Sequence, residues 1–503
     1  PVGMLRRGRA RLGEIFGFRL AGRDVTAFVG PRAHAAFFGA DDRQLSAREV
    51  YQFTVPVFGP GVVYDVRPEI LDEQMGFLVP ALRDERLRTY ARVMREEVEA
   101  YVEAWGDEGE VDLLVALNEL TVFIASRCLI GEEFRRRLSK EFAHLYHDLE
   151  GGITLLAFFN PYLPVPAFRR RDRARARVTE LIAGVIAERR ALGFAGEDFL
   201  QTLMDARGAD GRGLADEVIV GLLLSVIFAG QHTSAVMGAW TGILLLEHPE
   251  FLPPILAEQE AVLGGGEMTI DRLRHLAVLE RAVKEAERMH PPLILLMRLV
   301  SRDFAVGEHV IPAGGLAMVS PAAAHRLPEV FADPDRYDPE RFAPPRLEDR
   351  RTRHGLIGFG GGHHRCIGST FALQQIKIIW SVLFQHFELS LARSGHQPDY
   401  TTFVVGPRAP CRVRYRRRRR VLATVPDIAA ATGSKAREAR EDRGAPRPPR
   451  SAGHTSGVWG GLEGVQAPSS FTAARGRREK ARAAGLSPDY WYPVEYDRRV
   501  RKG

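Results

Sequence analysis

The sequence predicts one large, mainly helical domain with small β-sheets at its edges, an α+β fold. Apolar residues recur at three- and four-residue spacing through most of the middle of the chain, which indicates helices. Shorter alternating stretches broken by Gly and Pro lie on either side and indicate small sheets. A length of 503 residues, with 45% hydrophobic and 26% charged residues, suits a globular protein and excludes a wholly disordered or fibrous chain.

The predicted elements follow one another along the chain. Residues 1–65 contain alternations such as IFGFRLAGRDVTAFVG, which predict a small hairpin sheet. Six segments with helical periodicity come next: 82–105, 113–130, 142–149, 178–192, 214–248 and 271–290. Turn-rich sequence fills 291–362, a last apolar helix is predicted over 368–386, and alternation over 401–415 predicts a closing strand.

Targeting signals and cysteines point to a cytoplasmic protein. The longest apolar run, 218–230, is shorter than the roughly 18 to 20 residues that span a bilayer, so we expect a buried helix and no transmembrane anchor. Residues 1–10 are basic but lack the apolar core of a signal peptide, and the absence of an initial Met leaves a truncated N-terminus open. Cys128, Cys366 and Cys411 are too few for a disulfide framework or a four-cysteine metal site, which favours a reducing compartment.

The C-terminal part of the chain differs in charge from the rest. Residues 412–503 carry 22 Lys and Arg against 9 Asp and Glu. We therefore predict a main domain over 1–416, a linker rich in Arg, Ala, Gly and Pro over 417–457, and a C-terminal extension over 458–503. The extension contains SPDYWYPVEYD, which weakly resembles the opening of a Rieske-type oxygenase domain. A fused redox module and a disordered basic tail both stay open.

The sharpest local pattern is a cysteine in a glycine-rich turn directly before a helix, FGGGHHRCIG over 359–368. Glycines permit positive φ and close approach to a flat ligand, while backbone amides and the helix N-terminus stabilise a thiolate at Cys366. Such a thiolate ligates a metal or acts as a nucleophile with His363 or His364 as its base, whereas a zinc site would need a distant fourth ligand. The alternative is an inert buried cysteine, which this glycine- and histidine-rich setting disfavours.

A second pattern is Glu-x-x-Arg near the end of a predicted helix. Glu285 and Arg288 are three residues apart and therefore share one helix face. Arg341, in the later loop sequence PERF, can complete a Glu-Arg-Arg cluster. Taken alone the pattern is weak, because most such pairs are solvated surface contacts.

A third pattern, AGQHTS over 229–234, places polar residues inside the most apolar helix. The Thr233 hydroxyl can bond a backbone carbonyl, bend the helix and open a polar groove. For this hexapeptide in isolation, a helix that simply passes from buried to exposed is slightly favoured over a polar groove. His232 alone is typical of a core histidine whose hydrogen bonds are satisfied.

In this order, the groove helix, Glu-x-x-Arg helix, PERF loop and cysteine turn resemble the cytochrome P-450 haem-thiolate monooxygenases. The turn matches the pattern Phe-x-x-Gly-x-x-x-Cys-x-Gly at Phe359, Gly362, Cys366 and Gly368. Within the superfamily, residues 10–416 are most similar to sterol 14α-demethylases. The stretches that carry this similarity are VYQFTVPVFGPGVVYD, FAGQHTS, HPPLILLMR and VVGPRAPCRVRYRRR.

The resemblance implies a cytochrome P-450 haem-thiolate fold, with haem b bound through Cys366 as the axial thiolate ligand. It also implies that Thr233 and His232 are catalytic and deliver protons to bound dioxygen, and that Glu285, Arg288 and Arg341 form a structural triad. The implied cofactor-binding residues are Tyr51, Arg298, Phe359, Gly360, His363 and His364. The implied sterol-binding residues are Phe53, Phe58, Phe228, Ala229, Leu295 and Phe403.

The activity implied by the resemblance is removal of the 14α-methyl group of a sterol by three successive oxygenations with loss of formate. Electrons must come from a ferredoxin or another donor protein, since no flavin or nicotinamide fingerprint is present. Two departures put haem propionate contacts in doubt: His363 stands where many relatives carry Arg, and residues 72–75 lack a basic residue that many relatives have. The absence of an anchor makes the chain more similar to the soluble bacterial type.

Three alternatives stay open at this point. The same chemistry on another polycyclic terpenoid would fit equally apolar cavity residues. A non-catalytic thiolate-haem sensor or binding protein is disfavoured by the polar groove over 229–234, since a sensor needs no proton delivery. Binding of nucleic acid by the Arg-rich tail is disfavoured because no folded recognition module accompanies it.

Overall fold

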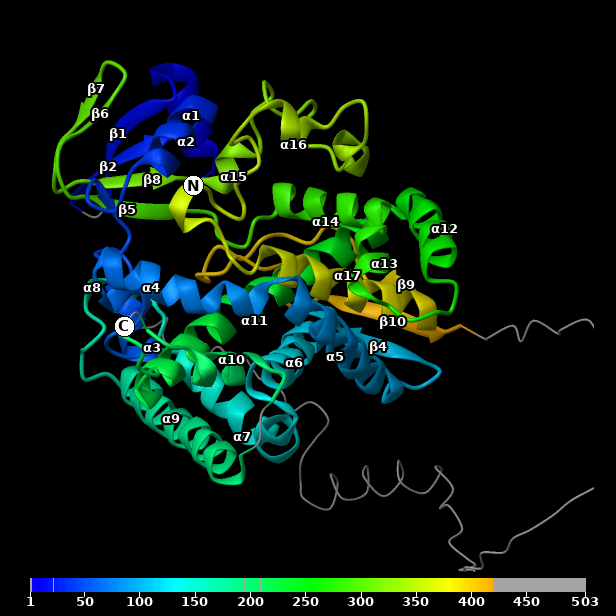
Figure 1. Cartoon of the computed structure of the whole chain (residues 1–503). Helices are drawn as coiled ribbons and strands as arrows, with labels where there is room; N and C mark the ends of the chain where they lie inside the picture. Colours follow the sequence, from blue (N-terminus) through cyan, green and yellow to red (C-terminus); the bar gives the residue numbers. More distant parts are fainter. Residues whose placement is uncertain (1, 21, 194–195, 209, 419–503) are drawn as a thin grey trace, which may run out of the picture. The chain divides into compact units, whose positions relative to one another are not determined.

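Helices and three small sheets form the domain in the computed structural model, which describes residues 2–20, 22–193, 196–208 and 210–418 (Figure 1). The predicted α+β class is confirmed. The predicted extension over 458–503, and the linker over 417–457 apart from Arg417 and Arg418, lie outside the described residues.

The helices are α1 (Val2–Leu12), α2 (Pro31–Gly39), α3 (Val55–Phe58), α4 (Pro68–Leu78), α5 (Asp84–Glu103), α6 (Leu113–Ala125), α7 (Glu132–Glu150), α8 (Leu155–Phe159), α9 (Pro166–Leu192), α10 (Phe199–Asp205), α11 (Asp216–Glu247), α12 (Leu252–Leu263), α13 (Ile270–Arg274), α14 (Ala277–Met289), α15 (Pro321–Ala324), α16 (Glu348–Arg351) and α17 (Ser369–His386). The strands are β1 (Ile15–Leu20), β2 (Arg23–Phe28), β3 (Leu45–Ser46), β4 (Glu108–Asp112), β5 (Leu296–Val300), β6 (Phe304–Val306), β7 (His309–Ile311), β8 (Leu316–Val319), β9 (Phe387–Leu391) and β10 (Arg412–Arg417). Short turns of 3₁₀ or π-helix join them, among them η4 (Ser126–Ile130), η6 (Pro339–Phe342) and η7 (Gly362–His364).

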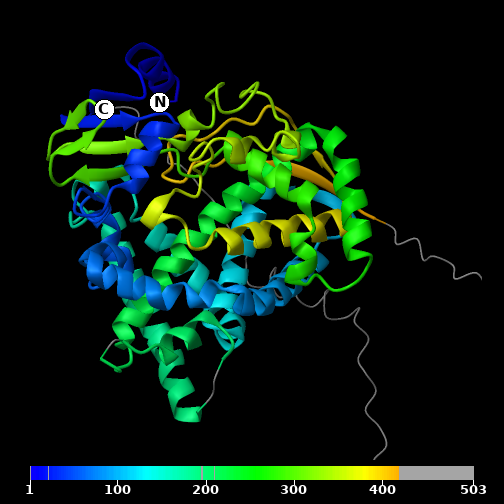
Figure 2. The ribbon, with the colours of Figure 1, turned by 45° about the horizontal axis from the view of Figure 1, so that its top comes forward.

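The largest sheet has the strand order β1-β2-β8-β5-β3, and Figure 2 shows its blue and green strands side by side at one edge of the domain. The predicted hairpin is present, with Ile15 opposite Phe28. Strand β2 then pairs in parallel with β8, placing Val25 opposite Leu316. The residues of β8 are buried on both faces, as a continuous apolar run requires. This sheet brings the start of the chain to the segment that precedes the cysteine turn.

The predicted closing strand is shorter than its alternating sequence. Only Arg412–Arg417 forms β10, which lies between β4 and β9 in a three-stranded antiparallel sheet. Val413 lies opposite Val111 on one side and Leu391 on the other. This sheet joins the end of the domain to the beginning of α6.

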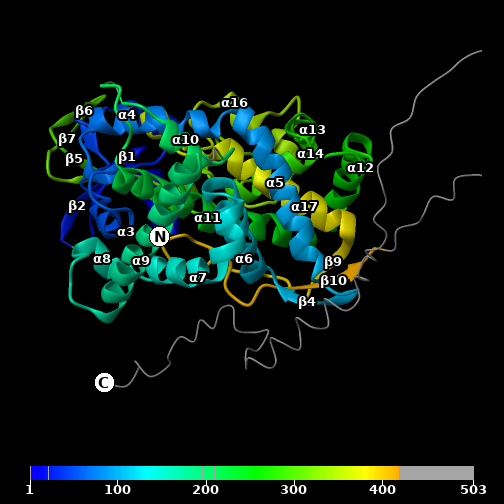
Figure 3. The ribbon, with the colours of Figure 1, turned by 60° about the horizontal axis from the view of Figure 1, so that its bottom comes forward.

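The core is built around α11, which packs against α6, α14 and α17 (Figure 3). Its apolar residues surround the whole helix, as expected for a helix buried on all sides. A Cβ at Gly242 would lie 1.9 Å from the Trp380 ring, so glycine is required where α17 crosses. Trp380 Nε1 donates to Gly238 O at 3.0 Å, which satisfies the buried indole.

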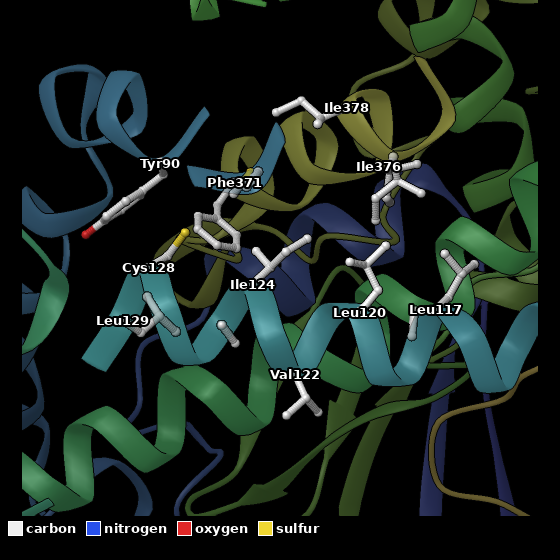
Figure 4. Packing of buried hydrophobic residues seen from close by; sticks show 14 of the residues in the cluster. Tyr90, Leu117, Leu120, Val122, Ile124, Cys128, Leu129, Phe371, Ile376 and Ile378 are labelled. Atoms are coloured by element: carbon white, nitrogen blue, oxygen red, sulfur yellow. The ribbon is translucent and has the colours of Figure 1, made fainter. Parts of the chain in front are cut away.

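Helices α6 and α17 interdigitate next to this centre. In Figure 4, Leu120 and Ile124 of α6 point toward Phe371 and Ile376 of α17, whereas Val122 points the other way. Within the part of the chain that the structure describes, three segments are long and apolar enough to cross a membrane by length and composition: Leu113–Ile130, Asp216–Glu247 and Gly362–His386. Between 61% and 67% of each apolar window is buried inside the fold, which accounts for their composition as core helices.

Candidate active site

The cysteine turn is held by its own backbone and by α2. The Cys366 N–H donates to Phe359 O at 2.9 Å, which closes the turn. Gly360 and Gly362 have φ of 69° and 63°, so the expectation of positive φ is met at both. A Cβ at Gly362 would lie 1.9 Å from Phe38 O, and glycine therefore also serves close packing against α2. Helix α17 begins three residues after Cys366.

The thiol of Cys366 is solvent-exposed, unlike those of the other two cysteines, and opposing effects act on its pKa. Burial raises its pKa, the Gly368 N–H opposes this, and the nearby Glu287 raises it further. The Gly368 N–H therefore acts in the direction that the turn predicts, while desolvation acts against it. A bound cation would reverse this balance, since a coordinating thiol is deprotonated outright. Cys128 and Cys411 are buried, and burial raises the pKa of each, as expected for inert thiols.

Arg298 on β5 is a buried cation without an ion-pair partner among the residues the structure describes. Its side chain is 4% exposed, and Nη1 donates to Phe37 O at 3.1 Å. Burial lowers the pKa of Arg298, and Asp42 acts against this through space. The Tyr51 hydroxyl contacts the same strand from outside it, since it accepts a hydrogen bond from the Met297 N–H at 3.4 Å. A buried cation beside a phenol suits a carboxylate ligand such as a haem propionate, so this donor set fits the implied cofactor.

Two histidines of the turn each meet an aspartate. His364 Nε2 lies 2.5 Å from Asp42 Oδ1, and Asp42 has a pKa held below its usual range by this contact despite partial burial. His363 Nε2 lies 2.9 Å from Asp72 Oδ1, which joins the turn to α4. Residues 72–75, which lack the basic residue that many relatives have, therefore contact the turn through the carboxylate of Asp72. A cavity of about 240 Å³ is lined by Asp42, Tyr64 and His364, among others.

The polar segment of α11 contacts a residue of α7, Glu150, that the sequence did not indicate as part of the site. Thr233 Oγ1 donates to Ala229 O at 2.6 Å, as expected for a hydroxyl that bonds back along its helix. His232 Nδ1 lies 3.3 Å from Glu150 Oε1 at the end of α7. Nothing in the sequence near Glu150 marks it, because 82 residues separate it from its partner. Gln231 faces α6 and donates to Asn118 O at 3.1 Å.

The predicted sterol-binding side chains fall into two contact groups. Phe58 of α3 and Phe228 of α11 have ring centroids 5.6 Å apart. Phe53 and Phe403 have centroids 5.7 Å apart, with Phe53 buried and Phe403 half exposed. Leu295 packs against the cluster that contains β5 and β8, and Ala229 precedes Thr233 by one turn. A separate groove of about 340 Å³ between α7 and α9 has a charged lining and contains none of these residues.

The structure brings the three residues of the Glu-Arg-Arg cluster together in a fully buried network. Arg288 Nε and Nη2 donate to the Glu285 carboxylate at 2.7 and 2.8 Å. Arg341 Nε, from η6, donates to both Glu285 oxygens at 3.1 Å. Arg341 Nη1 also donates to Glu348 Oε2 at 2.8 Å, a fourth member that the sequence pattern did not indicate. The network ties α14 to the loop before the cysteine turn.

Known proteins resemble this chain over most of its length. A sterol 14-demethylase of Arabidopsis thaliana is 43% identical, covering 83% of this chain and 87% of that protein. A sterol 14alpha-demethylase of Mycolicibacterium vanbaalenii is 40% identical over 83% and 94%, and a lanosterol 14-alpha demethylase of Mus musculus is 37% identical over 83% and 84%.

Solved structures agree on the fold. The retinoic acid bound cyanobacterial CYP120A1 has a TM-score of 0.75 at 24% identity, covering 82% of this chain and 94% of that one. The cytochrome P450DA heme domain has a TM-score of 0.73 at 25% identity, covering 83% and 93%. The family model described as Cytochrome P450 matches residues 3–413. The chain therefore belongs to the cytochrome P450 family.

Proposed function

We propose that this protein is a haem-thiolate monooxygenase that removes the 14α-methyl group of a sterol. Similarity to demethylases from a plant, a bacterium and a mammal over 83% of the chain is the observation that carries the substrate class. It disfavours the sensor and the tail-centred nucleic-acid alternatives, because the similarity lies in the catalytic domain.

Cys366 would hold haem b through its thiolate, with Phe359 and Gly360 of the turn beside it. The propionates would bind Arg298, Tyr51 and His364. His363, which contacts Asp72 of α4, would lie at the edge of the haem next to that helix. When bound, haem b supplies the activation of dioxygen, at a cost of two electrons in each of three turns.

The chain itself supplies protons along α11. His232 is partly exposed and paired with Glu150, so it takes protons from solvent and is held by the carboxylate. The Thr233 hydroxyl donates to Ala229 O, and rotation about its Cα–Cβ bond would free it to donate to a ligand instead. Glu285, Arg288 and Arg341 serve folding and touch no substrate.

The sterol is held by apolar contacts. The Phe58–Phe228 and Phe53–Phe403 pairs, with Leu295 and Ala229, provide apolar surfaces that suit a polycyclic ligand and exclude water from the reacting carbon. Phe403 is half exposed and would contact the sterol at the solvent side of this apolar surface. A ferredoxin or another electron-donor protein supplies the electrons, and three unpaired cysteines suit a cytoplasmic location.

The decisive experiment begins with the optical spectrum of the purified holoenzyme, reduced and bound to carbon monoxide. Ferric enzyme is then titrated with lanosterol and obtusifoliol, and formate release is measured with a ferredoxin and its reductase. A thiolate-type Soret band, a sterol-induced spin shift and formate support the proposal. A thiolate band without sterol response assigns the chemistry to another polycyclic terpenoid, and absence of haem overturns the role of Cys366.

A further inference from the structure

Glu287 is a buried acid that the Glu-x-x-Arg pattern leaves unused. It lies between Glu285 and Arg288 in the sequence Glu-Ala-Glu-Arg and is 4% exposed. Residues two apart on an α-helix point in nearly opposite directions. Glu285 therefore faces η6 and its network, while Glu287 faces the other side of α14, toward the residues that lead into the cysteine turn.

The contact of Glu287 is with the backbone at Gly358. Its carboxyl packs against Gly358, and the Gly358 N–H lowers the pKa of the carboxyl against the effect of burial. A Cβ at Gly358 would lie 2.3 Å from Oε1 and within 3 Å of two carbons of the same side chain, so only glycine fits against the carboxyl. The charged groups that act on Glu287 are Lys284, Arg365 and Asp349, and Lys284 is itself engaged with Asp349 at 3.2 Å.

Two buried histidines hold the residues immediately before Gly358. Ile357 N–H donates to His325 Nε2 at 2.8 Å, and His325 Nδ1 lies 3.2 Å from Arg288 O. His34 Nδ1 lies 3.0 Å from His354 O. Residues 354–358 are thus fixed by three buried side chains from separate parts of the domain, and Glu287 holds the position nearest the cysteine.

We propose that Glu287 is a positioning residue for the thiolate turn, whose carboxyl holds the Gly358 N–H and so fixes the approach of Cys366 to the cofactor. This rests on the proposed role of Cys366 as haem ligand. Burial raises the pKa of Glu287 to about 8, so the group is largely neutral at pH 7 and glutamine preserves both its shape and its acceptor oxygen.

The test compares Glu287→Gln with Glu287→Leu in the haem-loaded enzyme at pH 7. For Glu287→Leu we expect haem transfer to apomyoglobin at least fivefold faster, and loss of a large part of the thiolate-type Soret band after carbon monoxide binding. Glu287→Gln should stay within twofold of the unsubstituted enzyme in both measurements. The matched control is Glu340→Leu, which removes a half-exposed acid that pairs with Arg281 of the same helix and lies in η6, away from the turn.

Thermal unfolding of the same variants separates positioning from general stability. Replacing a buried carboxyl by leucine removes its desolvation cost, so the melting temperature of Glu287→Leu should not fall with the thiolate signal. Gly358→Ala supplies a second variant that needs no change at Glu287. Gly358→Ala should weaken haem retention when Glu287 is present. In the double variant with Glu287→Ala the loss of retention should be much smaller, because the Glu287 side chain that would clash with the new Cβ is absent.

Two results overturn the positioning role. One is Glu287→Leu with unsubstituted haem transfer and Soret band, and the other is Glu287→Gln failing as badly as Glu287→Leu. If the unsubstituted enzyme itself binds no haem through a thiolate, the proposed function fails. That result is recorded before any variant is compared, so the two failures are distinguishable.

Discussion

His232 Nδ1 of α11 and Glu150 Oε1 of α7 lie 3.3 Å apart, a contact between two residues that are 82 positions apart in the sequence. The pair closes one side of the polar segment that contains Thr233. Four polar residues, 231–234, interrupt the apolar core helix here, and the pair accounts for His232, next to a Thr233 hydroxyl that bonds back to its own helix. The predictions below test this relationship and the residues around Cys366.

Replacing Glu150 by Gln is expected to lower the rate of formate release about tenfold while sterol binding stays unchanged, because the carboxylate orients His232 for proton transfer. The measurement is formate per minute together with the sterol-induced spin shift. Asp148→Asn, on the same helix and partly exposed, is the matched control and should leave the rate unaltered. An unchanged rate in Glu150→Gln would remove the pair from proton delivery.

Thr233→Ala is expected to divert electrons from product to hydrogen peroxide, since the hydroxyl that supplies the proton is gone. We expect formate per electron consumed to fall about tenfold and peroxide to rise correspondingly. Thr233→Ser keeps the hydroxyl and should retain most of the coupling. Equal peroxide yields from the two variants would contradict this role.

Arg298→Met should weaken haem retention about tenfold, because it removes a buried cation that suits a propionate. The measurement is the rate of haem transfer to apomyoglobin. Arg302→Met changes an exposed arginine just after the same strand and serves as control. Unaltered retention in Arg298→Met would show that the propionate does not meet this side chain.

Glu285→Gln is expected to destabilise the fold by about 3 kcal/mol, since it leaves Arg288 and Arg341 buried without their shared carboxylate. Urea unfolding of the purified protein gives the free energy directly. Glu340→Gln, which removes an exposed pair with Arg281, should cost less than about 1 kcal/mol. A cost for Glu285→Gln no larger than that of the control would contradict a structural role.

Low pH should weaken the contacts by which His34 and His325 hold residues 354–358. Burial lowers the pKa of His34 to about 4 and that of His325 to about 3, so both are neutral in the folded protein while the unfolded chain binds protons below about pH 6.5. Their stabilisation is complete above pH 6.5 and is lost as the pH falls toward these values, by about 2 kcal/mol for each histidine at pH 5.

The measurement is urea unfolding at pH 7 and pH 5. His325→Gln reproduces the neutral donor and acceptor pattern and should reduce the loss between the two pH values, whereas His275→Gln changes an exposed histidine and should not. An identical pH dependence in His325→Gln and the unsubstituted protein would rule out His325 as a contributor.

Helical periodicity predicted the long core helices well, because burial on one or all sides dictates their apolar spacing. The prediction over 214–248 corresponds to α11 (Asp216–Glu247), and that over 368–386 to α17. It was wrong where charge obscures the pattern: α7 runs over Glu132–Glu150, ten residues longer at its start, through a highly charged stretch. The predicted helix over 271–290 is two helices, since the backbone leaves the helical region at Leu276.

Short helices near the N-terminus were missed for a similar reason. α1 and α2 lie in the region where the sequence predicted only a hairpin sheet. Their helical form depends on packing against the sheet and the turn rather than on a clear apolar stripe, as with α1, which buries only Leu5.

The sequence by itself determined the chemistry that lies within short segments: the cysteine turn, the Glu-x-x-Arg spacing and the polar break in an apolar helix. These features are local, because helix geometry and glycine dihedrals fix neighbours three or four residues apart. Only the tertiary structure decided the pairs His232–Glu150, His363–Asp72, Arg341–Glu348 and Glu287–Gly358. The distances within these pairs depend on how elements far apart in the chain pack. The same packing sets the desolvation that raises the pKa of Cys366, against the effect of the Gly368 N–H in its own turn.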